Sequence, residues 1–190
     1  MMAKLFTDNT FILLLVLVAA TLTDATRHRI PNPLTLGGIL IAIAWHSWMS
    51  GWLGLLNSLG GLALGLLLLL PLYLRRVMGA GDVKLMATAG AFLGWSDTLI
   101  ATSFSLMAGG VFALFLLLAH GGGGALLRRW LVTFKALFTT GEFIYIRPQP
   151  TEAAAMRFPY AVAIAVGTTV CLWWLGRLDS LLEIVGGIYG

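Results

Sequence analysis

The chain has 190 residues, of which 59% are hydrophobic and 11% are charged, and its mean hydropathy is +0.92. One soluble core cannot bury so much apolar surface, so the composition predicts an all-α integral membrane protein. The formal net charge of +4 comes without a basic stripe or a nucleic-acid-binding motif, which argues against nucleic acid as a partner.

Six apolar segments predict a bundle of six transmembrane helices with short connections. They cover residues 10–23, 34–52, 53–74, 77–95, 99–119 and 158–175. No internal repeat is visible, so residues 1–190 are expected to form a single membrane-embedded domain. A signal peptide is the alternative for the first segment, because Lys4 precedes it, although Asp8 weakens the basic lead.

Basic residues fall on the first, third and fifth connections between these segments. They are Arg27, Arg29, Arg75, Arg76, Arg128, Arg129, Lys135, Arg147 and Arg157. By the positive-inside rule, these connections face the cytoplasm and both termini lie outside. In the fifth connection, residues 125–139 carry apolar side chains at helical spacing and predict an interfacial helix on the cytoplasmic surface of the lipid bilayer; a lid over a functional site is the alternative.

Two acidic residues are predicted to meet at the cytoplasmic face. Asp24 ends the first segment and Asp82 follows the third, so the topology brings them to the same side of the membrane. Residues 84–95 are too short to cross an apolar layer of about 30 Å, so their helix is expected to begin before Asp82. A carboxylate drawn into the membrane is a functional candidate, with a structural carboxylate at a water-filled helix end as the alternative.

The residues beside Asp82 are candidates for contact with a substrate. Gly79 and Gly81 remove side chains where a peptide backbone could approach, and a methyl group is expected to be more harmful at Gly81, which adjoins the acid. Close helix packing is the alternative for both glycines. Lys84 is expected to reach the cytoplasmic surface, because residues two positions apart lie on opposite sides of a helix; contact with substrate is the alternative.

Three stretches resemble the aspartic prepilin peptidases of bacterial type IV pili and type II secretion. MGAGDVKL (78–85) is similar to the intramembrane GxGD motif of that family, DATRHRIPN (24–32) to its first-aspartate segment, and RFPYAVAIAVG (157–167) to its terminal proline-containing helix. The resemblance implies a multi-pass protein of the bacterial inner membrane with Asp24 and Asp82 as catalytic residues near the cytoplasmic side. It also implies a prepilin or pseudopilin substrate, for which Gly79, Gly81, Lys84 and Arg29 are candidate contacts.

The chain departs from the larger members of that family in one respect. Those members carry a zinc-binding insert with paired CxxC motifs that is linked to N-methylation, whereas this chain has the single cysteine Cys171 and a short first connection. It therefore resembles the minimal peptidases that serve Flp pili in tight-adherence systems. No metal or other cofactor is expected, and N-methylation is not implied.

Two carboxyl groups can hydrolyse a peptide bond if they hold one water molecule and share a proton. Two other function classes stay open: a small proton-coupled transporter or channel with Asp24 and Asp82 as relay groups, and a non-catalytic scaffold. The sequence shows no sign of the inverted repeats that are typical of transporters, which argues against the first class. A non-catalytic scaffold would not need a second acid at the same depth, which argues against the second. Asp97 is expected at the opposite face beside Trp95, outside the site.

Overall fold

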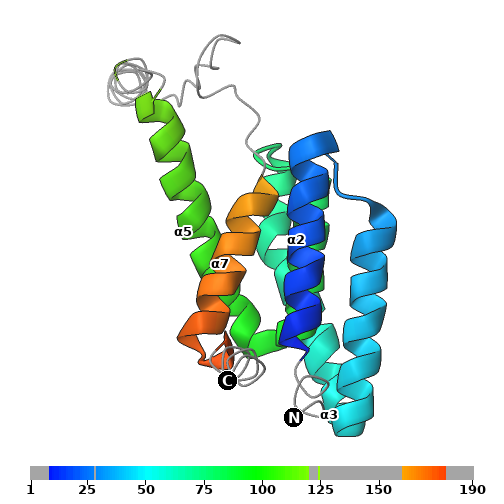
Figure 1. Ribbon diagram of the computed structural model, residues 1–190. Helices are drawn as coiled ribbons and strands as arrows, with labels where there is room; N and C mark the ends of the chain where they lie inside the picture. Colours follow the sequence, from blue (N-terminus) through cyan, green and yellow to red (C-terminus); the bar gives the residue numbers. More distant parts are fainter. Residues whose placement is uncertain (1–8, 28, 120–123, 125–159, 179–190) are drawn as a thin grey trace, which may run out of the picture. The chain divides into compact units, whose positions relative to one another are not determined.

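The computed structural model describes residues 9–27, 29–119, 124 and 160–178. The described part of the chain is helical and contains no strand, which confirms the predicted all-α fold for these residues. Its helices are α2 (Thr10–Arg27), α3 (Asn32–Leu74), α4 (Ala80–Leu93), α5 (Trp95–Ala119) and α7 (Tyr160–Trp174) (Figure 1). The expected interfacial helix at residues 125–139 lies outside the described residues.

Three of these helices are long and apolar enough to cross a membrane, judged by length and composition. They are α2, α3 and the Trp95–Leu116 part of α5, and they identify an integral membrane protein. The apolar helix α7 is shorter, and α4, with 14 residues, extends about 21 Å at the rise of an α-helix. The number of six transmembrane helices therefore stays a prediction.

α3 is broken near its middle. Ser50 (φ −133°, ψ 15°) and Gly51 (φ 56°, ψ −136°) leave the helical region, and the positive φ of Gly51 is one that glycine adopts readily. An added Cβ at Gly54 would overlap the carbonyl oxygen of His46, so the two halves of α3 approach each other closely around the break. The break lies beside the predicted boundary between the second and third apolar segments.

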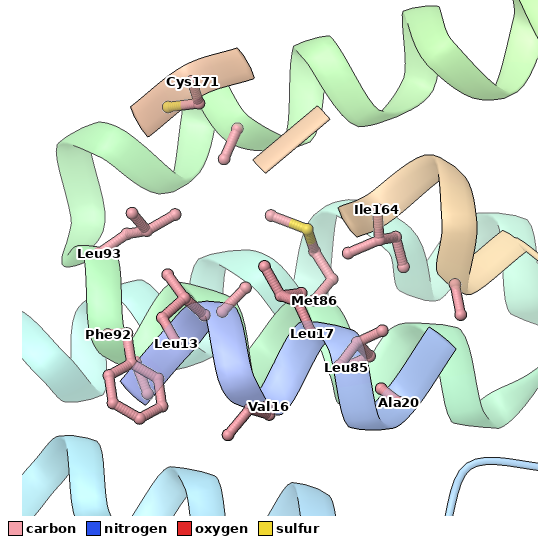
Figure 2. Close-up of a cluster of buried hydrophobic side chains, with 14 of the residues drawn as sticks. Leu13, Val16, Leu17, Ala20, Leu85, Met86, Phe92, Leu93, Ile164 and Cys171 are labelled. Carbon is pink, nitrogen blue, oxygen red and sulfur yellow. The ribbon is translucent and has the colours of Figure 1, made fainter. Parts of the chain in front are cut away.

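α4 is enclosed by other helices of the bundle. Residues 83–93 are all buried except Lys84, and α4 contacts α2, α3 and α7. Figure 2 shows the apolar cluster at the centre of these contacts, to which α2 contributes Leu17, α4 contributes Met86 and α7 contributes Ile164. A helix that is covered in this way holds the residues of its first turn at a fixed place relative to its neighbours.

Small residues allow α3 and α4 to pack backbone against backbone. An added Cβ at Gly61 of α3 would overlap the carbonyl oxygen of Gly90 of α4, and one at Gly65 would lie 2.5 Å from the carbonyl oxygen of Met86. Two small residues four positions apart form the close-packing pattern of membrane helices. The contact therefore fixes the position of α4 along α3.

We expect Gly61→Ala to destabilise the folded protein by about 1–3 kcal/mol, because the added methyl group would push against the backbone of α4. Gly60→Ala is the matched control, since its Cβ would lie 3.4 Å from Cβ of Trp95, an ordinary contact, and alanine favours a helix over glycine. Thermal unfolding in detergent compares the two variants. Equal unfolding temperatures would show that the contact does not depend on Gly61.

Candidate active site

The two predicted catalytic aspartates lie on neighbouring helices at the same end of the bundle. Asp24 is in the last turn of α2 and Asp82 is in the first turn of α4. The two helices are antiparallel, because at the other end Asn9, just before α2, donates a hydrogen bond from Nδ2 to the carbonyl oxygen of Phe92 at 2.8 Å. α2 also contacts α4 directly, so the turns that carry Asp24 and Asp82 are neighbours. The structure thus brings these two residues together.

The carboxyl group of Asp82 is held at the start of its own helix. The residue is 9% exposed, and its Oδ2 accepts a hydrogen bond from the backbone N–H of Gly79 at 3.1 Å. A carboxylate in the first turn also interacts favourably with the helix dipole. α4 begins at Ala80, so the prediction that its helix starts before Asp82 is confirmed.

Gly79 and Gly81 have different surroundings. An added Cβ at Gly79 would lie 3.2 Å from Oδ2 of Asp82, whereas one at Gly81 would meet the side chain of Ile30 at 3.4 Å. Gly79 is exposed and Gly81 is half-buried. Gly79 therefore borders the carboxyl group, and Gly81 packs against the connection between α2 and α3. The sequence predicts that an added methyl group is more harmful at Gly81, whereas this geometry predicts that it is more harmful at Gly79.

Lys84 is directed toward the start of α3. Its exposed side chain donates a hydrogen bond from Nζ to Oδ1 of Asn32, the first residue of α3, at 3.0 Å. Arg29 is exposed in the connection between α2 and α3. The roles of Lys84 and Arg29 in substrate binding stay predictions. Asn32 lies in the stretch that resembles the first-aspartate segment, but no pattern in the sequence pairs it with Lys84.

Tyr160, the first residue of α7, is a further polar residue at this end of the bundle. It is half-buried. α7 contacts both α2 and α4, which carry the two aspartates. The sequence indicates the helix through RFPYAVAIAVG, but nothing in its pattern distinguishes Tyr160 from other aromatic residues at helix ends.

Asp97 lies in the first turn of α5, which follows the end of α4, and thus away from the aspartate pair. Its carboxylate forms an ion pair with Arg177, which follows α7. The ion pair neutralises Arg177, which lies at the end of the bundle where the charge pattern predicts almost no basic residues.

Among the residues that the structure describes, histidine, cysteine, aspartate and glutamate form no group of three or more that could hold a metal ion.

Comparisons with known proteins show which family the chain resembles. The sequence model of the type IV leader peptidase family matches residues 11–114, which include Asp24 and Asp82. The prepilin leader peptidase/N-methyltransferase of Aeromonas salmonicida (strain A449) is 34% identical over 114 residues, which cover 54% of this chain and 38% of that protein. The protein of the same description from Myxococcus xanthus (strain DK1622) is 32% identical over 120 residues, which cover 60% of this chain and 36% of that protein.

No solved structure gives a significant match to the chain. The matched region is 38% or less of the length of these two curated relatives. The family match, in contrast, covers more than half of the 190 residues and extends from α2 into α5. The chain therefore belongs to the type IV leader peptidase family.

Proposed function

We propose that this protein is an intramembrane aspartic endopeptidase that removes the short leader peptide from type IV or Flp prepilins. The observation that carries the proposal is the pair of Asp24 and Asp82, which lie together within the region that the family matches. The names of the relatives, prepilin leader peptidase/N-methyltransferase, support the class of substrate. A prepilin or pseudopilin in the membrane is the proposed partner.

The chemistry requires one base and one acid. Two carboxyl groups that lie close together in a partly buried site can share one proton, because two negative charges there repel each other. The charged aspartate takes a proton from water as the water oxygen attacks the carbonyl carbon, and the protonated aspartate donates to the carbonyl oxygen. The C–N bond of the resulting diol then breaks as its nitrogen receives the proton that the first aspartate took from water, while the second aspartate takes a proton back from a diol hydroxyl, which returns the pair to its starting state.

The distribution of charge supports a site at the cytoplasmic face of the inner membrane. Arg27 ends α2 and Arg29 follows it, while Arg75 and Arg76 follow α3. All four are exposed, and the first two come shortly after Asp24. By the positive-inside rule, this end of the bundle faces the cytoplasm and both chain termini lie outside.

We further propose that the peptidase works without a metal and does not N-methylate its product. The paired CxxC motifs of the zinc-binding insert have no counterpart in this chain, which contains one cysteine. The described relatives combine both activities in their names, and the match covers a limited part of each. The lack of the CxxC insert supports small Flp-type prepilins, with a leader that ends in glycine, as substrates.

Asp24→Asn and Asp82→Asn should each reduce cleavage of a co-expressed Flp-type prepilin by about 100-fold or more, because each removes the base or the acid. The mass of the pilin reports loss of its leader. Asp97→Asn is the control, since Asp97 is paired with Arg177 away from the two aspartates. Wild-type cleavage by either active-site variant would refute the mechanism. Proton flux across vesicles without any cleavage by the wild-type protein would instead favour a transporter.

Gly79→Ala should lower kcat/KM by about tenfold, which equals about 1.4 kcal/mol of transition-state stabilisation, because the methyl group would crowd Oδ2 of Asp82. Gly81→Ala should be milder, since its added Cβ would meet the side chain of Ile30 at an ordinary contact distance of 3.4 Å. Both rates are normalised to the folded protein in detergent. A larger loss in a folded Gly81→Ala variant would mean that Gly81 is the point at which the substrate backbone approaches.

Cleavage should continue at an unchanged rate in the presence of a strong chelator and should not increase with added zinc, because the proposed reaction uses two carboxyl groups and water. A zinc-dependent protease under the same conditions is the control for the chelator. Inhibition that zinc reverses would contradict the proposal of a metal-free enzyme.

A further inference from the structure

Three helix ends meet at the proposed active site, and each contributes a polar side chain. α2 ends with Asp24 in its last turn, α4 begins with Asp82 in its first turn, and α7 begins at Tyr160. α7 contacts both α2 and α4, and Tyr160 is half-buried at the start of α7. The hydrolytic steps above use the two aspartates and leave the tyrosine hydroxyl without a role.

A glycine of α5 makes room for the ring of Tyr160. An added Cβ at Gly109 would lie 2.7 Å from Cε2, 2.8 Å from the hydroxyl oxygen and 2.9 Å from Cζ of Tyr160. Gly109 is buried, and the same two helices also approach closely where an added Cβ at Gly167 would overlap the backbone of Ser105. Packing of α5 against α7 therefore sets the position of the hydroxyl group.

A phenol is neutral near pH 7 and can donate a hydrogen bond, and such bonds are strongest when the acceptor is charged. Two other ionisable side chains belong to the helix turns around Asp82. Asp24 of α2 is itself an acid, and Lys84 of α4 donates a hydrogen bond to Asn32 of α3. Hydrogen bonds of a catalytic site are often long before substrate binds and shorten in the complex with substrate.

We propose that Tyr160 is a positioning residue of the active site, whose hydroxyl donates a hydrogen bond to the aspartate pair, longer in the free protein and shorter when substrate is bound, and orients the charged carboxylate toward the attacking water. The inference rests on the proposed peptidase function. In this proposal, Gly109 leaves the space that holds the ring of Tyr160 in position.

Tyr160→Phe removes the hydroxyl and keeps the ring. We expect kcat to fall about 10- to 100-fold with little change in KM, the range for loss of one hydrogen bond to a charged group. The acidic limb of the pH–rate profile should move to higher pH, because the carboxylate loses a donor that favours its charged form. Tyr73→Phe, which removes the hydroxyl of a 41% exposed tyrosine near the end of α3, is the matched control and should change neither. An unchanged profile for Tyr160→Phe would overturn the inference.

A second pair of variants tests whether Gly109 positions the ring of Tyr160. Gly109→Ala should slow cleavage, whereas Gly110→Ala should not, because Gly110 is exposed and its added Cβ would meet no described atom within 4 Å. Combined with Tyr160→Phe, Gly109→Ala should cause little further loss, since both changes act through the same hydroxyl group. Fully additive losses would contradict the assigned role of Gly109.

Thermal unfolding in detergent at several pH values tests the same contact without cleavage. Tyr160→Phe should unfold at a lower temperature than the wild-type protein at neutral pH, and the difference should shrink on acidification, because a hydrogen bond to a carboxylate is lost when the carboxylate is protonated. If the wild-type protein cleaves no prepilin, the proposed function fails, yet this measurement still decides whether Tyr160 binds the pair. A difference that is the same at every pH would show that it does not.

Discussion

The close backbone contact between α3 and α4 is the constraint on which the rest of the structure depends. Apolar side chains gain little by leaving lipid for one another, so helices in a membrane associate through tight packing and hydrogen bonds rather than through the hydrophobic effect. Gly61 and Gly90 permit such packing, and it holds α4 between α2, α3 and α7. With α4 enclosed, the start of the helix has a fixed place, and Asp82 stays buried beside Asp24.

The candidate site also follows from where the helices end. A carboxylate in the middle of an apolar helix is costly, whereas one in a first or last turn can be reached by water and by backbone N–H groups. Asp82 receives such an N–H from Gly79, and Asp24 lies one turn before the exposed Arg27. The chain thus keeps both carboxyl groups in the end turns of their helices, which suits the proposed cleavage between a soluble leader peptide and a membrane-bound pilin segment.

Local patterns in the sequence predict the helices and the aspartate pair but not the contacts between distant residues. Apolar length places the start of α4 before Asp82, and the two-residue spacing sends Lys84 away from it, as the structure shows. The partner of Lys84, the contact of Gly81 with Ile30 and the place of Tyr160 depend on how helices far apart in the chain pack, which periodicity does not encode. The environments of Gly79 and Gly81 differ for the same reason.

The order of the helices along the chain has a consequence for biosynthesis. α2, α3 and α4 emerge from the ribosome before α7, so the side of α4 that α7 covers stays open until the last described helix is made. Two carboxyl groups can already approach each other at that stage, but the side chain at the start of α7 is still missing. A nascent chain that stalls before residue 160 therefore lacks one wall of the site, and assembly of the complete site waits for the last described helix to dock.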